Sequence, residues 1–98
     1  MRYLRTITIY LSLSASALTA EPAHTEKNVA YGTHERQVLD FYQADSRKPT
    51  PLVLHIHGGG WINGDKKDPL GLEKYLNAGI SVASINYRYT LQAQAQGN

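Results

Sequence analysis

Two short runs of apolar and β-branched residues, 52–56 and 80–87, constrain the fold of this chain most strongly. The first run, LVLHI, is apolar on both faces apart from His55, which predicts a strand buried on both sides of a sheet. A helical pattern at residues 69–78 separates the two runs. A strand, a helix and a strand of these lengths predict a parallel pair joined by a right-handed crossover, so the expected fold class is α/β.

The expected helix has sequence signals at both ends. Asp68 and Pro69 suit the N-cap and the first helical position, and Gly79 suits the left-handed position that follows a helix. The apolar stripe of this helix is expected to consist of Leu72, Tyr75 and Leu76.

Residues 28–44 precede these runs and are predicted to form two extended segments around Gly32-Thr33-His34-Glu35. Apolar and polar side chains alternate in the second segment, which favours a β-hairpin with a four-residue connection. The polar, proline-bearing stretch 45–51 is expected to be a loop. The predicted order is therefore hairpin, strand, glycine loop, helix and strand.

The N-terminus has the composition of a secretory signal peptide. Two arginines precede an uncharged segment that ends in small residues. We expect residues 1–20 to be a signal peptide cleaved after Ala17 or Ala20, which makes the protein an exported one, periplasmic or secreted. The alternation of Ile and Leu with Thr and Ser also suits a β-strand, which is the alternative. The segment is too short and too rich in Ser and Thr to span a membrane, so no stable membrane anchor is expected.

The charge of the chain is nearly balanced, since 10 Lys and Arg oppose 8 Asp and Glu over 98 residues. Arg2 and Arg5 account for the excess of +2, so no basic patch indicates a nucleic-acid partner or an anionic surface. Cysteine is absent, which excludes disulfides, thiolate metal ligands and a lipid-modified cysteine.

Three consecutive glycines, Gly58, Gly59 and Gly60, follow the first apolar run directly. Residues without Cβ allow unusual backbone turns and let a ligand lie against the main chain. In open α/β sheets, ligands bind at the carboxyl ends of the strands, which is where these glycines are expected. Free peptide N–H groups there can stabilise a negative oxygen that develops on a substrate carbonyl. A tight turn without a ligand is the alternative, and the flanking His57, Trp61 and Gly64-Asp65 argue against it.

The stretches HIHGGGWINGDK and VASINYRY resemble the N-terminal portion of an α/β-hydrolase esterase or lipase of the HGGG type, similar to hormone-sensitive lipase and to ferulate and acetyl esterases. The resemblance extends from about residue 28 to residue 89. It implies that the glycine loop supplies oxyanion-hole N–H groups, with Gly59 and Gly60 as the main donors and Gly58 shaping the turn. It also implies that His57 anchors the loop, that Trp61 packs beside the acyl pocket and that Asp65 tethers the loop ahead of the helix.

The serine, acid and histidine that this resemblance implies cannot be assigned in this chain. The nearest match to the G-x-S-x-G motif is Gly79-Ile80-Ser81-Val82-Ala83, but Ser81 opens a strand, whereas the nucleophile of this family lies on a strand-to-helix turn. Ser46 and Ser84 lie in no motif. The histidines do not complete a triad either: His24 and His34 precede the fold or lie in its hairpin, and His55 and His57 belong to the loop strand.

Two other interpretations remain open. His55 and His57 are two residues apart and so share one face of a strand, as in metal-dependent amidohydrolases, but no third ligand is identifiable. The chain is alternatively a degenerate, non-catalytic hydrolase.

The preferred interpretation is that residues 21–98 form part of a larger α/β-hydrolase domain. Two or three parallel-type strands with one covering helix leave an apolar face, and residues 52–56 are then expected at an exposed edge prone to aggregation. The parent protein is expected to hydrolyse small-molecule carboxylic esters without a metal or another cofactor. This chain by itself is expected to be inactive.

Overall fold

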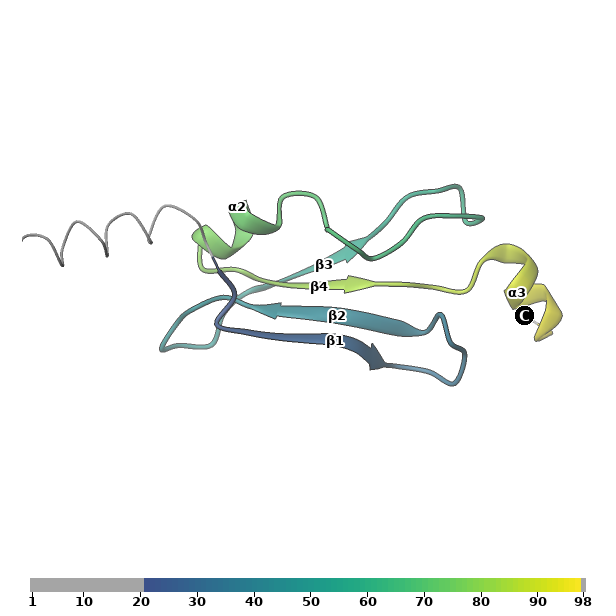
Figure 1. The fold of residues 1–98 in the computed structure, drawn as a ribbon, viewed down its shortest axis with the longest axis horizontal. Coiled ribbons are helices and arrows are strands. Elements are labelled where there is room, and N and C mark those ends of the chain that lie inside the picture. The colour runs from purple at the N-terminus through teal and green to yellow at the C-terminus, as the bar shows by residue number, and fades with distance from the viewer. Residues whose placement is uncertain (1–20, 98) are drawn as a thin grey trace, which may run out of the picture.

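The computed structural model describes residues 21–97, so the expected signal peptide lies outside the described residues. Four strands form one sheet: β1 (His24–Ala30), β2 (Val38–Gln43), β3 (Leu52–Ile56) and β4 (Ser81–Ile85). Within this part of the chain there are two helices, α2 (Leu72–Asn77) and α3 (Thr90–Ala95). The strand order is β1-β2-β4-β3, in which β3 and β4 are parallel and the other neighbours are antiparallel (Figure 1). The predicted α/β class and the parallel pair are therefore confirmed.

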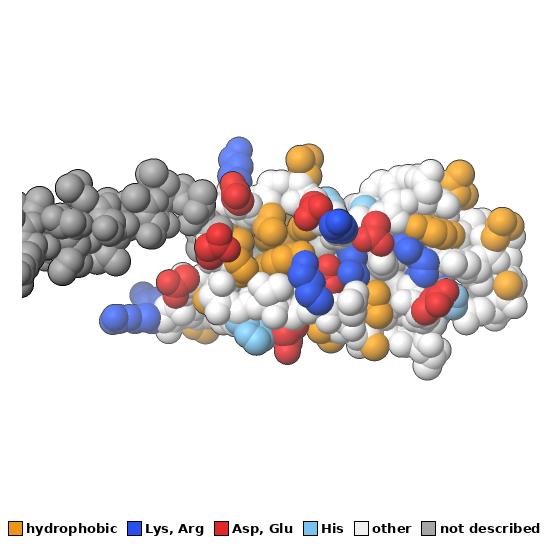
Figure 2. All heavy atoms as spheres, in the orientation of Figure 1, with side chains coloured by type: hydrophobic (Ala, Val, Ile, Leu, Met, Phe, Trp, Pro, Cys, Tyr) orange, Lys and Arg blue, Asp and Glu red, His pale blue; other side chains and the backbone are white. Residues whose placement is uncertain are grey.

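The core lies between one face of the sheet and α2. Val82 on β4 and Tyr42 on β2 are buried on this face, and Leu76 is the buried residue of α2. Burying a leucine side chain of this kind stabilises a fold by about 1.5–3 kcal/mol. Leu72 and Tyr75 pack against the same cluster, as the predicted stripe requires. Figure 2 shows hydrophobic side chains gathered beside α2 and bordered by charged ones.

Strand β3 lies at an exposed edge of the sheet, as expected for residues 52–56 in a partial domain. The interpretation of its apolar pattern as burial on both sides was wrong for this chain. Leu52, Leu54 and Ile56 share one face and are 57%, 55% and 52% exposed. On the opposite face, Val53 packs against the core below α2. The apolar pattern identified the strand correctly, but within residues 21–97 no helix covers the second face.

Helix α2 is shorter than predicted, because it begins at Leu72 rather than at Pro69. Gly71, not Asp68, is its N-cap residue, and Asp68 has a positive φ of 51° that no helix start requires. The Pro69 carbonyl accepts a hydrogen bond from the Leu72 N–H, so the predicted first turn is a separate turn that leads into the helix. Gly79 follows the helix with φ 77°, as predicted.

The hairpin is longer than predicted at both its start and its connection. β1 begins at His24, which therefore belongs to the sheet instead of preceding it, and residues 31–37 connect β1 to β2 in place of a four-residue turn. Helix α3 was not predicted, and it follows β4 closely. Figure 1 places α3 at the same end of the molecule as the loop that follows β3.

Candidate active site

The glycine run that follows β3 adopts a conformation that requires glycine at one position in particular. Gly59 has φ 128°, and a Cβ on it would lie 2.0 Å from the Asn63 carbonyl oxygen. The Gly59 carbonyl closes a turn by accepting hydrogen bonds from the Ile62 and Asn63 N–H groups, at 3.2 and 3.3 Å. Gly60 and Trp61 follow with positive φ values of 62° and 67°. The backbone therefore turns sharply away from the sheet at the carboxyl end of β3.

Two carbonyl groups, one before this turn and one within it, are held by residues that follow β4. The Tyr87 hydroxyl donates to the His57 carbonyl at 2.8 Å, and the Thr90 N–H donates to the Trp61 carbonyl at 2.9 Å. The His57 ring holds the next carbonyl, with Nδ1 2.7 Å from the Gly58 oxygen. This is possible because β3 and β4 are parallel with Ile56 beside Ile85, so that both strands end at the same edge of the sheet.

The backbone amide groups of the glycine run, unlike the carbonyl groups of Gly58 and Gly59, are left without hydrogen-bond partners in the described residues. Among residues 21–97, the N–H groups of Gly58, Gly59 and Gly60 donate no hydrogen bond. Gly58 and Gly60 are exposed, and Gly59 is half-buried. Free amides beside anchored carbonyls form a concentration of positive partial charge, which can bind an oxygen that carries negative charge.

Aromatic side chains surround the anchors. The Tyr87 ring stacks on the buried His57 ring, with centroids 4.4 Å apart and planes 16° apart. Trp61 and Tyr87 pack edge to face with ring centroids 5.3 Å apart, and Trp61 is 63% exposed, so most of its indole faces outward beside the glycine run. Tyr89 donates to the Gly64 carbonyl, to which Arg36 also donates at 3.2 Å. Packing of this kind restricts the loop to one arrangement.

Asp65 lies where the loop returns toward the sheet. Its carboxylate accepts hydrogen bonds from the Asn86 side-chain amide at 3.0 Å and from the Lys67 N–H at 2.9 Å. Burial by itself raises the pKa of this carboxyl, but these hydrogen bonds and the charges of Lys66 and Arg36 outweigh it. The pKa of Asp65 therefore lies below its ordinary value of 3.8.

A buried ion pair fastens the next residue to the hairpin. Lys66 Nζ lies 2.9 Å from Asp40 Oδ1, and their side chains are 10% and 2% exposed. The same carboxylate accepts a hydrogen bond from the Asn28 N–H at 2.9 Å and lies 3.7 Å from the exposed Lys27 ammonium. The Lys66 backbone is bound as well, because its N–H donates to Asn86 Oδ1 at 2.8 Å. Both ends of the loop are thus attached to the sheet.

The structure does not bring His55 and His57 together as ligands of one metal ion. The Nδ1 atom of His57 faces the Gly58 carbonyl, and residues 21–97 contain no group of three or more His, Cys, Asp and Glu side chains that could hold a metal ion. Ser81 is a buried residue of β4 that accepts a hydrogen bond from the Ala44 N–H at 2.9 Å. Ser84 is also buried and donates to the Lys66 carbonyl at 2.8 Å. Neither serine is placed to attack a substrate.

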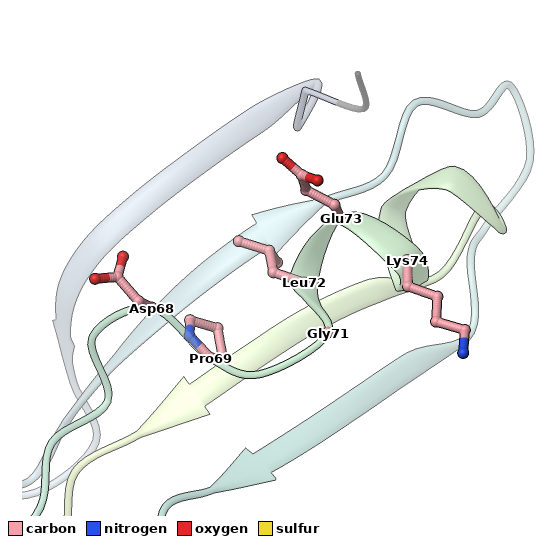
Figure 3. Close-up of a pocket in the computed structure, with 6 residues that line it drawn as sticks. All are labelled: Asp68, Pro69, Gly71, Leu72, Glu73 and Lys74. Carbon is pink, nitrogen blue, oxygen red and sulfur yellow. The ribbon is translucent and has the colours of Figure 1, made fainter. Parts of the chain in front are cut away.

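A hollow of about 430 Å³ lies beside the start of α2 (Figure 3). Its lining combines two carboxylates, a lysine and apolar groups, from Asp68, Pro69, Gly71, Leu72, Glu73 and Lys74. None of these residues belongs to the glycine run or to the segment that anchors it.

Within residues 21–97, no helix is long and apolar enough to cross a membrane.

Sequence reasoning missed most of the residues that anchor the loop. Tyr87 and Tyr89 belong to the stretch VASINYRY but carry no predicted role, and no role is predicted for Thr90 or Arg36. Their position could have indicated Tyr87, Tyr89 and Thr90, because all three follow a parallel strand and such residues gather at the edge of the sheet where ligands bind. Arg36 lies in the hairpin connection, and no sequence pattern indicates that it reaches this edge.

A comparison with protein families decides the classification. The BD-FAE family model matches residues 39–97, which include most of β2, the glycine run, Tyr87 and α3. The chain belongs to the BD-FAE family. Its fold is of the α/β-hydrolase type.

Several relatives support this membership. The chain is 42% identical over 64 residues to a protein of Oryza sativa subsp. japonica named "Probable isoprenylcysteine alpha-carbonyl methylesterase ICME". It is similar to the solved structure of the bifunctional GH43-CE protein of Bacteroides eggerthii, with a TM-score of 0.60 and 27% identity over 70% of this chain. It is also similar to esterase B from Lactobacillus rhamnosis, with a TM-score of 0.53 and 26% identity over 89% of this chain.

The chain spans only a part of each of these relatives. The matched region covers 63% of this chain but 16% of the methylesterase, and the structural matches cover 10% of the bifunctional protein and 32% of esterase B. The strand order and the glycine loop described above therefore correspond to one portion of larger proteins.

Proposed function

We propose that this chain forms the oxyanion-hole portion of a serine carboxylic-ester hydrolase. The observation that carries the proposal is the arrangement of the glycine run: the carbonyls of His57, Gly58, Gly59 and Trp61 are bound, while the amides of Gly58, Gly59 and Gly60 are free. When a nucleophile adds to an ester carbonyl, the negative charge that develops on oxygen needs donors already in place. Losing one such donor costs about 3–4 kcal/mol of transition-state stabilisation.

The substrate is a small-molecule carboxylic ester. The names of the Oryza methylesterase and of esterase B support ester chemistry. The exposed face of Trp61 beside the glycine run is suited to contact the acyl group of the substrate. Acyl transfer of this type proceeds through a covalent serine intermediate and calls for no metal or other cofactor. Neither the near-zero charge of residues 21–98 nor the site suggests nucleic acid as a partner.

The nucleophile is supplied from outside residues 21–97. Ser81 and Ser84 are occupied in the core, and the relatives are several times longer than the matched region. The open edge of β3 and its uncovered apolar face support a role for the chain as one portion of a larger sheet. We therefore expect the 98-residue chain to be inactive by itself. We also propose that residues 1–20 are a signal peptide, cleaved after Ala17 or Ala20, that exports the protein.

The test is to express the complete reading frame that contains this sequence and to assay it on p-nitrophenyl acetate. We expect ester hydrolysis that a serine-directed phosphonate abolishes and that Gly59→Ala lowers by about 100-fold to 1,000-fold. Gly58→Ala is the matched control, because it keeps the N–H and its Cβ meets no atom within 4 Å. The proposal fails if the frame encodes a serine nucleophile, the protein is folded and no ester is cleaved. Turnover by the 98-residue chain itself would contradict the placement of the nucleophile.

The rival function is that of a degenerate, non-catalytic hydrolase. The same assay separates the two, because a degenerate protein would show no difference between the Gly59 and Gly58 variants. A metal-dependent reaction has no support in the positions of His55 and His57.

A further inference from the structure

Tyr87 contacts the glycine loop through both its ring and its hydroxyl group. It lies two residues beyond β4, next to the end of β3. Its ring stacks on His57 and packs edge to face with Trp61. Its hydroxyl approaches the carbonyl oxygen of His57, at 2.8 Å, and the Nδ1 atom of the same residue, at 3.3 Å. The hydroxyl has one proton, so these two approaches cannot both be donations.

The positions of the acceptors decide where the protons lie. A carbonyl oxygen only accepts, so the Tyr87 hydroxyl proton goes to the His57 carbonyl. The Gly58 oxygen, 2.7 Å from Nδ1, also only accepts, so Nδ1 of His57 carries a hydrogen. The opposite tautomer would direct a lone pair at a carbonyl oxygen. The Tyr87 oxygen, 3.3 Å from Nδ1, keeps its lone pairs and is a second acceptor for the Nδ1 hydrogen, so Tyr87 supports the same tautomer. His57 Nε2 is then a bare acceptor, and it is buried with no hydrogen-bond partner among residues 21–97.

These bonds fix two successive peptide groups. In a trans peptide, the C=O and the N–H point in opposite directions. Holding the His57 carbonyl toward Tyr87 therefore directs the Gly58 N–H to the other side. Likewise, the Gly58 carbonyl is held toward the His57 ring, so the Gly59 N–H points away from that ring.

We infer that Tyr87 is a positioning residue of the oxyanion loop, which orients the amides of Gly58 and Gly59 through the His57 carbonyl and through the tautomer of the His57 ring. The inference rests on the proposed function only for what the amides bind. The hydrogen-bonding pattern itself is a property of this chain and can be measured without any substrate.

The experiment uses the full chain labelled with nitrogen-15 and compares it with two variants. Long-range nitrogen–proton NMR spectra report which ring nitrogen of His57 carries the hydrogen, at a pH where the ring is neutral. We expect a single tautomer with hydrogen on Nδ1. Tyr87→Phe keeps the stacked ring but removes the donor to the His57 carbonyl and the second acceptor for the Nδ1 hydrogen, so we expect a detectable fraction of the Nε2 tautomer and shifted Gly58 and Gly59 amide signals. Tyr89→Phe is the matched control, since it removes a hydroxyl bound to Gly64 and leaves these signals in place.

Two results would overturn the inference. One is a wild-type His57 ring with its hydrogen on Nε2, which requires no variant and holds even if Tyr87→Phe does not fold. The other is a folded Tyr87→Phe protein with unchanged His57, Gly58 and Gly59 signals. In the complete enzyme, the same variant should lower kcat by about 10-fold to 100-fold with little change in KM. An enzyme without ester activity but with the expected tautomer would refute the proposed function and leave the role of Tyr87 intact.

Discussion

Replacing Asp40 by alanine tests whether the buried ion pair holds the loop to the hairpin. The carboxylate of Asp40 is almost completely buried and lies 2.9 Å from the Lys66 ammonium, whose side chain is 10% exposed. Asp40→Ala leaves that ammonium buried without its counter-charge and also leaves the Asn28 N–H without its acceptor. Breaking a buried pair from one side costs about 3–5 kcal/mol. A domain of about 80 residues has roughly 4–12 kcal/mol of total stability, so the loss is a quarter of it or more.

The assay is urea unfolding of the full chain, followed by far-UV circular dichroism. Lys27→Met is the matched control, because Lys27 lies 3.7 Å from the same carboxylate but its side chain is 55% exposed. An exposed pair of this kind contributes about 0–1 kcal/mol. The double change Asp40→Leu with Lys66→Met removes both charges and should recover most of the loss, since apolar replacements of buried pairs are often neutral.

The reasoning is refuted if Asp40→Ala costs no more than Lys27→Met. It is also refuted if the double variant is as unstable as Asp40→Ala, because the penalty would then not come from an unpaired buried charge.

Three further changes test other parts of the molecule. Gly59→Ala should disorder the loop, because its Cβ would lie 2.0 Å from a backbone oxygen, whereas Gly58→Ala should not; amide hydrogen exchange measures both. Leu54→Lys on the exposed edge strand should reduce self-association, measured by light scattering, because the added charge opposes edge pairing. Leu91→Lys on α3 adds the same charge away from the edge and should not reduce it; equal effects would refute edge pairing. The lowered pKa of Asp65 stabilises the fold above the unfolded value near 3.8, and this contribution should disappear as the pH falls through the folded pKa. A carboxyl titration by NMR with a midpoint at or above 3.8 would contradict it.

The elements of this fold could be predicted where local pattern and tertiary environment agree. The run 52–56 and the stripe of α2 carry apolar residues at the spacing of their structures, so β3 and the core-facing side of the helix were correctly expected. The start of α2 was wrong because Asp68 and Pro69 form a helix-start signal that also suits a preceding turn. The prediction that β3 is buried on both faces was wrong. Hydropathy shows which side chains of a strand could be buried, but it does not show whether a helix or another strand covers them.

The inner face of β2 shows a second limit of pattern reasoning. Leu39 and Phe41 are apolar and lie on the opposite face, yet the charged Asp40 is the residue buried at 1% exposure, together with Tyr42. The charge is buried because Lys66 reaches it from the far side of the glycine loop. No periodicity within β2 contains that information, since the partner lies 26 residues away in sequence.

The glycine run could be recognised from its residues, but the cause of its conformation could not, because that cause lies in a different segment. A run of glycines by itself is free to adopt many conformations, and it loses more entropy on ordering than any other sequence. What restricts it here are four bound carbonyls, and the side chain or amide that binds the first and the last of them comes from Tyr87 and Thr90. Those residues reach the loop only because β3 and β4 are parallel and in register at Ile56 and Ile85. The free amides are therefore a consequence of sheet pairing, and a change that shifts this register should disturb them as much as a change within the loop.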